Sequence, residues 1–348
     1  MEIIDCLPYF GDREIFNQGE LAARIVTACN NNDLVVLFNE DYRSTLAIGV
    51  HKFLISTCNA ARISTDKLLL IFHDFDSLLS STFKTIALPW EHNITLIHTD
   101  TTLHVSCNYK YAAGVFAGRA NSIRMYAIYK KLTSRHKDAF ISSLHQGFND
   151  VHDKIEQLHF MQISRLKHNQ CTLVAQHSDI DNIRPVPIMP GTNNNVSIWS
   201  NVYSMMPIEI ACETSAQPGC YHVSEKIFRP IAAKRIVIPV MPAGWKQFVT
   251  STYGFSFFED ELGLPTNYSN LPMHKQVDAA FNAVETLHRE NKIVGILDRC
   301  WDKIEHNYAA LQTLKQHEFA NRDMSIDDAV HKLLLQHSYH LPPSASAD

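Results

Sequence analysis

Residues 33–77 read DLVVLFNEDYRSTLAIGVHKFLISTCNAARISTDKLLLIFHDFDS. The segment 33–43 opens with a short apolar run that has the length of a buried strand. Residues 44–61 place apolar side chains at helical spacing, and residues 66–77 open with another apolar run. A strand, a helix and a second strand in succession predict a βαβ unit, and therefore a parallel sheet.

A second alternation of strands and helices begins near residue 112. Residues 112–136 have the pattern of a strand, a turn with glycine and a helix, and 138–144 that of a strand. Further strands are predicted at 208–213 and 236–242, and a helix followed by a short strand at 244–260. The sequence therefore predicts an α/β protein with two Rossmann-like domains facing a cleft, with ligands at the carboxyl ends of the strands. The expected parts are an N-terminal domain over 1–111, a C-terminal domain over 112–330, and a helix end with a frayed tail over 331–348.

Composition and charge restrict the class of protein. The chain has 348 residues, of which 45% are hydrophobic and 19% charged, and its formal net charge is −5. This is ordinary globular composition, and without a basic stripe we expect no nucleic-acid binding. The eight cysteines are dispersed and include no C-x-x-C pair, which argues against a disulfide framework or a zinc site. The N-terminus lacks the features of a signal peptide, and no apolar run reaches the roughly 20 residues of a membrane span, so we expect a cytoplasmic protein.

Two carboxylates follow the second predicted strand, in the segment HDFDS. Asp74 and Asp76 form a D-x-D pair, which one class of nucleotide-sugar transferase uses to hold a divalent metal on a diphosphate. Carboxylate oxygens are suitable ligands for Mg²⁺ or Mn²⁺. However, strands commonly end in acidic loop residues, and an ordinary loop is the more frequent explanation of so short a motif.

Two arginines flank the predicted start of a helix in GRANSIRMYAIYKKL, residues 118–132. A helix N-terminus presents free N–H groups and a partial positive charge, and an arginine beside it can contact a phosphate through two hydrogen bonds. Arg119 and Arg124 are therefore candidate phosphate ligands, although solvated surface arginines explain the pattern equally well. The segment does not contain G-x-G-x-x-G, so the dinucleotide-binding fingerprint is absent.

The segment PIEIACETSAQPGCYHVSEKIFRPIAAKRIVIPV, residues 207–240, places charged residues at the start of another helix. Glu213 ends a strand, and Ser224 stands at the expected N-cap. Glu225 and Lys226 then take the first helical positions, where the helix dipole favours a glutamate and disfavours a lysine. A phosphate shared between the lysine and the helix N–H groups would explain the lysine and leave the glutamate to bind ribose hydroxyls. A capped surface helix with an arbitrary lysine is the alternative.

These charged segments resemble a known family. CETS…YHVSEKIFRPIAAKRIVIPV…YGFSFF and FAGRANSIRMYAIYKKL are similar to the donor-site segments of the α-1,3-fucosyltransferase family and of related bacterial and giant-virus glycosyltransferases. Their order and spacing agree, and the resemblance covers about residues 115–260. It implies the GT-B architecture, in which the C-terminal of two Rossmann-like domains holds the nucleotide sugar. It also implies that no metal or other cofactor is needed, because cationic side chains and a helix N-terminus stabilise the leaving diphosphate.

The resemblance also assigns roles to the residues that match the family's motifs. Arg124 and Lys226 would contact the diphosphate, and Glu225 would accept a hydrogen bond from the ribose. At the remaining matched positions, Tyr221 or His222 would line the base or ribose pocket, and Glu213 would support the loop or approach the sugar.

The first 110 residues match no motif of this family, although they would supply the acceptor side and the catalytic base. Glu40 and Asp41 end a predicted strand and are our candidates for that base. The chain also departs from the family where Ala233 and Lys234 replace a common glycine. We expect transfer from a GDP-sugar such as GDP-fucose to a glycan or lipid-linked glycan in polysaccharide biosynthesis, and a lipid-linked acceptor would bring peripheral membrane association. The alternatives are a metal-dependent GT-A-type transferase that uses the D-x-D pair, and a non-catalytic α/β module that binds a nucleotide or sugar.

Overall fold

The computed structural model divides into two compact units. The first comprises Met1–Glu91, Gly219–His222 and Glu318–Asp348, and the second comprises His92–Pro218 and Val223–His317. Two late segments of the chain are thus grouped with the N-terminal unit, whereas the sequence predicts contiguous domains. The residues that the structure describes are 1–10, 15–39, 49–72, 75–87, 109–117, 122–144, 200–213, 219–316, 330–331 and 334–335.

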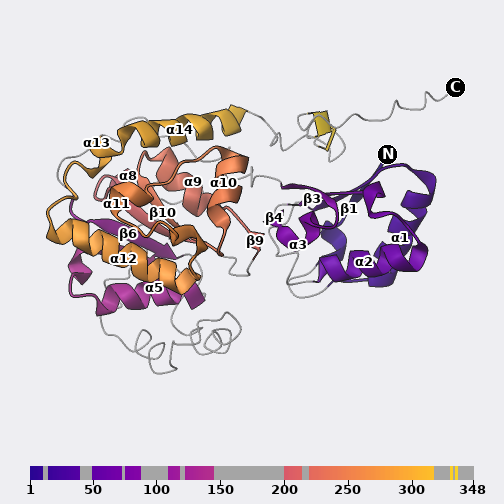
Figure 1. The fold of residues 1–348 in the computed structure, drawn as a ribbon, viewed down its shortest axis with the longest axis horizontal. Coiled ribbons are helices and arrows are strands. Elements are labelled where there is room, and N and C mark those ends of the chain that lie inside the picture. The colour runs from indigo at the N-terminus through magenta and orange to yellow at the C-terminus, as the bar shows by residue number, and fades with distance from the viewer. Residues whose placement is uncertain are drawn as a thin grey trace. The chain divides into compact units, whose positions relative to one another are not determined.

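The first unit is built on a four-stranded parallel sheet with strand order β1-β2-β3-β5 (Figure 1). Strands β2 and β3 pair along their length, with Val35 opposite Leu68, and α2 connects them. The βαβ unit predicted over 33–77 is therefore confirmed, and β1 and α1 precede it without having been predicted. The elements are β1 (Glu2–Asp5), η1 (Leu7–Tyr9), α1 (Gln18–Asn31), β2 (Val35–Asn39), α2 (Val50–Ala61), η2 (Thr65–Lys67), β3 (Leu68–Phe72), α3 (Ser77–Ser80) and β5 (Lys84–Ala87).

Alternate side chains of this sheet contribute to two hydrophobic layers. Leu37 and Leu70 belong to a layer shared with helices α1 and α2. Val36 belongs to a second layer, which also contains Val330 and Leu334 from the end of the chain, both 0% exposed. The C-terminal segment therefore returns to the first unit and packs against its sheet.

A short antiparallel pair also belongs to the first unit. Strand β4 (Phe75–Asp76) pairs with β9 (Cys220–Tyr221), so that Asp76 lies opposite Cys220. Part of the D-x-D segment is thus paired with the segment that precedes Ser224 in the sequence. This pairing explains why Gly219–His222 is grouped with the first unit.

The second unit also contains a four-stranded parallel sheet, with strand order β7-β6-β8-β10. Strand β7 lies on one side of β6, and the later strands β8 and β10 lie on its other side. The carboxyl ends of β6 and β8 therefore flank the point where the strand order reverses, which is where open α/β sheets bind ligands. The α/β class with parallel sheets agrees with the prediction from sequence. The elements are β6 (Ala113–Ala117), α5 (Ser122–Thr133), η3 (Lys137–Ala139), β7 (Phe140–Leu144), α8 (Ser200–Tyr203), β8 (Ile208–Cys212), α9 (Glu225–Ala232), β10 (Ile236–Val240), α10 (Trp245–Tyr253), α11 (Glu259–Leu262), η6 (Tyr268–Asn270), α12 (Met273–Arg289), α13 (Ile296–Arg299) and α14 (Trp301–Gln316).

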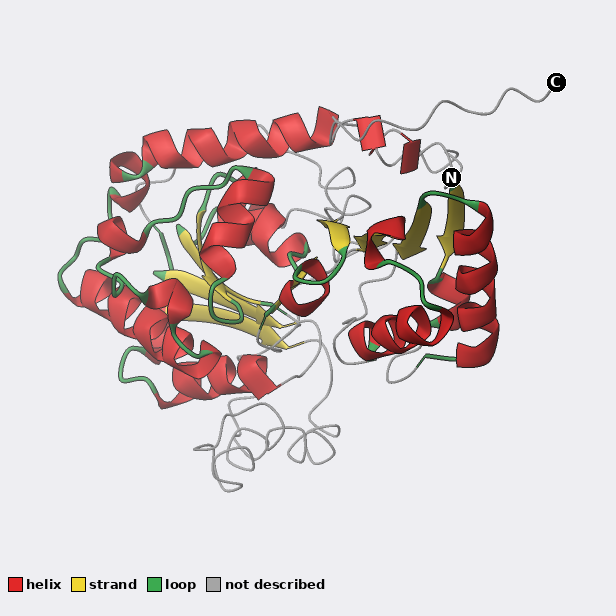
Figure 2. Cartoon of the chain, turned by 45° about the vertical axis from the view of Figure 1, so that its right-hand side comes forward, coloured by secondary structure: helices red, strands yellow, loops and turns green. Residues whose placement is uncertain are grey.

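Helices cover both faces of the second sheet (Figures 1 and 2). Helices α5 and α12 pack together on one face, and α9 packs with α14 on the other. Phe140 of β7 stacks on Phe281 of α12 with ring centroids 4.8 Å apart. Because both faces are covered, all five residues of β8 and of β10 are buried, which accounts for their nearly continuous apolar sequences.

One segment predicted as a strand is a loop. The residues GFSFF, 254–258, connect α10 to α11 with no regular structure. Their alternating aromatic residues satisfy packing rather than strand pairing: the ring of Phe257 meets Trp245 edge to face at 4.6 Å. The side chain of Asn307 accepts a hydrogen bond from the Ser256 N–H at 2.7 Å and donates one to the Ser256 carbonyl at 2.8 Å. A side chain of α14 thus takes the place of a neighbouring strand.

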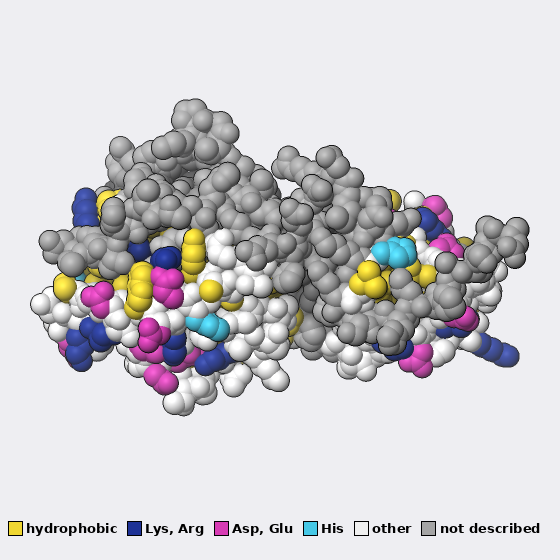
Figure 3. All heavy atoms as spheres, turned by 90° about the horizontal axis from the view of Figure 1, so that it is seen from above, with side chains coloured by type: hydrophobic (Ala, Val, Ile, Leu, Met, Phe, Trp, Pro, Cys, Tyr) yellow, Lys and Arg dark blue, Asp and Glu magenta, His cyan; other side chains and the backbone are white. Residues whose placement is uncertain are grey.

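Basic and acidic side chains are intermixed on the described part of the surface shown in Figure 3. This mixture matches the small formal net charge of −5. None of the helices in the described ranges is both long enough and apolar enough to cross a membrane.

Candidate functional site

Helix α9 begins at the residue where the sequence predicts it. Ser224 has an extended backbone, with φ −113° and ψ −177°, and its hydroxyl accepts a hydrogen bond from the Lys226 N–H at 3.4 Å. This is the arrangement of an N-cap, and it places Glu225 and Lys226 in the first turn. The sequence favours this start because serine at the cap offers an oxygen to an N–H that has no partner within the helix.

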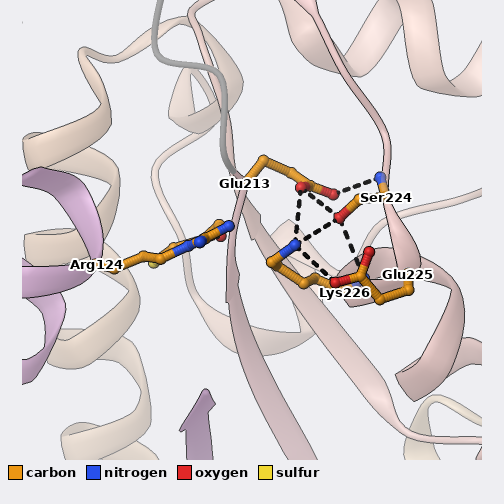
Figure 4. Close-up of polar contacts among 6 residues, drawn as sticks. Arg124, Glu213, Ser224, Glu225 and Lys226 are labelled. Carbon is orange, nitrogen blue, oxygen red and sulfur yellow. Dashed lines mark hydrogen bonds and ion pairs between the residues drawn. The ribbon is translucent and has the colours of Figure 1, made fainter. Parts of the chain in front are cut away.

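Glu213 connects the end of β8 to the start of α9. It directly follows the last residue of β8 and is 0% exposed. Its carboxylate accepts hydrogen bonds from the Ser224 N–H at 2.7 Å and from the Ser224 hydroxyl at 2.6 Å (Figure 4). A buried carboxylate is stable only when it is paired in this way. Glu213 is therefore a structural support that fixes the helix start against the strand.

Lys226 lies among three oxygen-bearing side chains. Its Nζ is 2.9 Å from Ser224 Oγ, 2.9 Å from Glu225 Oε1 and 3.9 Å from Glu213 Oε2 (Figure 4). The chain's own glutamates thus offset the lysine charge at the helix start. These protein oxygens account for the position of the lysine without a phosphate, and a phosphate contact by Lys226 stays a prediction.

Glu225 is held in its ionised form by neighbouring cations. Burial raises the pKa of its carboxyl group, but Lys226 and then Arg229 lower it further, and the balance places it at about 2. The side chains of Glu225 and Lys226 each retain 9% exposure, whereas that of Glu213 retains 0%. Glu225 and Lys226 are thus largely buried but retain a small exposed fraction, and Glu213 is fully enclosed.

Arg124 reaches this cluster from another helix. It lies in the first turn of α5, which follows β6, and it is 3% exposed. Its Nε donates a hydrogen bond to the carbonyl of Cys212, the last residue of β8, at 3.1 Å. Figure 4 shows its side chain extending from α5 toward Glu213. Arg124 and Glu213 thus lie at the carboxyl ends of the two strands that flank the reversal in strand order.

The sequence analysis did not identify three further buried polar residues, which are Tyr203 of α8, Glu209 of β8 and Arg229 of α9. Glu209 of β8 accepts a hydrogen bond from the Tyr203 hydroxyl at 2.5 Å, and the two residues are 1% and 0% exposed. Burial raises the pKa of Glu209 to about 7, although Arg229 and Tyr203 each lower it. Arg229 of α9 is 4% exposed. The available signal was a glutamate in the middle of the apolar strand IEIAC, which requires a buried partner.

The remaining predicted residues precede Ser224 in the chain or belong to other segments. Tyr221 lies in β9 and His222 follows it, and both are grouped with the first unit, while the cluster around Ser224 belongs to the second. Burial raises the pKa of Tyr221, and His222 is 4% exposed. Glu40, Asp41, Arg119 and Asp74 lie outside the described residues, and of Asp76 only the backbone in β4 is described.

Comparison of the chain with protein-family models, with curated proteins and with solved structures finds no match. Within the described ranges, no group of three or more His, Cys, Asp or Glu side chains is arranged to hold a metal ion. Glu225 and Lys226 lie in the first turn of α9, and Arg124 contacts the carboxyl end of β8, where the strand order of the parallel sheet reverses.

Proposed function

We propose that this protein is a metal-independent glycosyltransferase that moves a sugar from a nucleotide diphosphate, preferably a GDP-sugar such as GDP-fucose, to a glycan hydroxyl. One observation carries the proposal: Lys226, in the first turn of α9, lies 3.9 Å from Glu213, which directly follows β8, and Arg124 donates a hydrogen bond to Cys212, the last residue of β8. Both cations thus contact the carboxyl end of β8, beside the reversal in strand order. Cationic side chains beside a helix N-terminus at such a position are suited to a diphosphate.

The difference in burial among the charged residues supports separate roles. Glu213 is enclosed and holds the helix start in place, while Glu225 and Lys226 keep side-chain exposure of 9% each. The Lys226 ammonium group would move away from Glu225 and form an ion pair with the incoming phosphate oxygens. The Glu225 carboxylate would then accept hydrogen bonds from the ribose hydroxyls, which suits a group that is ionised at neutral pH.

The chemistry follows from this charge arrangement. The acceptor oxygen attacks the anomeric carbon, and the bond from that carbon to the diphosphate oxygen breaks with its electron pair. Arg124, Lys226 and the partial positive charge of the helix N-terminus would stabilise the negative charge that develops on the leaving diphosphate. The acceptor proton would pass to a carboxylate of the first unit, for which Glu40 and Asp41, after β2, remain our candidates.

The fold of the two units is compatible with this proposal. Each contains a parallel sheet, and the end of the chain, through Val330 and Leu334, packs against the sheet of the first unit. We propose that the units form a GT-B enzyme with the donor in the second unit, acting in the cytoplasm on a glycan or lipid-linked glycan.

A thermal-shift experiment tests the binding half of the proposal. The full-length protein is heated in EDTA with GDP, UDP, CMP or dTDP, and we expect GDP to raise the Tm most. A ligand at a hundredfold excess over its Kd stabilises the folded state by about 2.7 kcal/mol, which is readily detected. If none of the four nucleotides raised the Tm, the proposal would be wrong.

Hydrolysis of the donor tests the catalytic half. We expect slow release of GDP from GDP-fucose without acceptor, at the same rate with and without EDTA. Loss of activity in EDTA would favour the metal-dependent alternative, and binding without any turnover would favour a non-catalytic module.

A further inference from the structure

The charges around Glu225 change if Lys226 engages a diphosphate. In this structure Glu225 Oε1 is 2.9 Å from Lys226 Nζ, and the Glu225 side chain is only 9% exposed. A phosphate that draws the ammonium away would leave a largely buried carboxylate without its nearest cation. A buried carboxylate without a paired cation destabilises the protein by several kcal/mol, unless another cation takes the place of Lys226. The site therefore requires a second positive charge beside Glu225.

Arg229 is the residue placed to supply that charge. It lies four positions after Glu225 on α9, so the two side chains lie on the same face of the helix, and it is 4% exposed. Burial alone would lower the pKa of its guanidinium group, but Tyr203 and the carboxylates of Glu209, Glu225 and Glu213 together raise it.

A fixed carboxylate lies behind Arg229. Glu209 lies in β8, which α9 covers, and Glu213 directly follows that strand. Glu209 is bound to the Tyr203 hydroxyl at 2.5 Å. The Tyr203 carbonyl in turn accepts a hydrogen bond from Arg235 Nε at 2.7 Å. These contacts fix the position of Glu209, whose carboxylate is one of the groups that stabilise the charge of Arg229.

We propose that Arg229 is a positioning residue for the donor site, which keeps Glu225 ionised and oriented toward the ribose once Lys226 has turned to the diphosphate. This inference rests on the proposed function. Before binding, Lys226 and Arg229 both offset the charge of Glu225, and after Lys226 has turned to the diphosphate Arg229 does so alone. Arg229 need not touch the ligand.

Calorimetric titration with GDP tests this role in the full-length protein. We expect Arg229→Gln to weaken binding by at least about tenfold, because it leaves a buried charge without its partner. Arg229→Lys keeps the charge and should retain most of the affinity. In the Glu225→Gln background the Arg229→Gln change should cost much less, since the carboxylate that Arg229 serves is gone.

The proton balance of binding separates positioning from a general loss of structure. In Arg229→Gln, Glu225 should take up a proton as GDP binds, so the measured enthalpy should depend on the ionisation enthalpy of the buffer. The wild-type enthalpy should depend on the buffer much less. If Arg229→Gln does not fold, the double variant with Glu209→Gln, which removes a carboxylate together with the guanidinium, provides the same test.

Two results would overturn the inference. One is unchanged affinity in Arg229→Gln, and the other is an equal loss with and without the Glu225 carboxylate. Either would leave the proposed function intact, because wild-type binding of GDP is measured in the same series. Wild-type protein that binds none of GDP, UDP, CMP and dTDP would contradict the proposed function itself, and this inference with it.

Discussion

The two units bury charge to different extents. Among the described residues, every Asp, Glu, Lys or Arg that is less than 9% exposed belongs to the second unit. The buried polar residues described in the first unit are Asn39, Thr57 and His222, and its sheet is covered by hydrophobic layers on both faces. The nine buried charged residues of the second unit are Arg124, Lys131, Glu209, Glu213, Glu225, Lys226, Arg229, Arg235 and Glu259.

This difference indicates which part of the molecule keeps buried charges at a cost in stability, as expected of a functional site. Burying an ion pair costs several kcal/mol of desolvation, which pairing only partly offsets, so apolar residues of similar volume would serve a merely structural purpose as well or better. Three of these charged residues, Glu213, Glu225 and Lys226, lie together at the start of α9, beside the reversal of strand order in the second sheet. The first sheet has no such reversal among its described strands. Charge and topology therefore select the same edge.

The largest effect is expected from removing the enclosed carboxylate. Glu213→Ala would leave the Ser224 N–H, the Ser224 hydroxyl and Lys226 without their shared acceptor, all in a buried setting. We expect a loss of about 3–5 kcal/mol in the free energy of unfolding of the second unit. Urea denaturation followed by tryptophan fluorescence measures it.

The matched control for this variant is Glu305→Ala. Glu305 also pairs with a lysine, Lys234, at 2.7 Å, but its side chain is 39% exposed. An exposed pair of this kind contributes less than about 1 kcal/mol. Equal losses in the two variants would contradict the view that the cluster at α9 is a buried support.

A smaller effect should appear in the pH dependence of stability. The folded-state pKa of Glu209 is raised from 4.5 to about 7, mainly by burial. The folded protein therefore binds more protons than the unfolded chain between these values, and the contribution of Glu209 is full below pH 4.5 and lost as pH rises toward 7. The wild-type protein should lose on the order of 3 kcal/mol relative to Glu209→Gln across this window.

Parallel urea titrations of the wild-type protein and Glu209→Gln at pH 5 and pH 8 measure this difference. Glu209→Gln keeps an acceptor for the Tyr203 hydroxyl, so the comparison isolates the charge. Identical pH dependence in both proteins would show that Glu209 is ionised throughout, and that burial does not dominate its titration.

The same contrast explains what the sequence could predict. Local signals identified both βαβ patterns, the N-cap at Ser224 and the charged pair that follows it, because each depends on neighbours within a few residues. Features that depend on packing between distant segments were not predicted correctly. The loop 254–258 looked like a strand because its aromatic residues alternate, yet Asn307 of α14 holds it.

The buried network behind α9 also depends on the folded arrangement. Glu209 and Arg229 are 20 positions apart and meet only after α9 packs on β8. The charge of Lys226 was visible in the sequence, but its pairing with Glu225 and Ser224 was not. The structure adds that Arg124 contacts Cys212 at the end of β8 and that Lys226 lies near Glu213, the next residue in the chain.

The most direct test of the account is calorimetric titration of GDP into the wild-type protein and three variants, in EDTA at neutral pH. Lys226→Ala and Arg124→Ala each remove one proposed diphosphate contact. Lys246→Ala is the control, because Lys246 also lies in the first turn of a helix and pairs with a glutamate, Glu259, at 2.8 Å, but its side chain is 44% exposed. We predict that Lys226→Ala and Arg124→Ala abolish measurable binding in folded protein and that Lys246→Ala binds like the wild type. Wild-type affinity in both Lys226→Ala and Arg124→Ala would contradict the assignment of the nucleotide site.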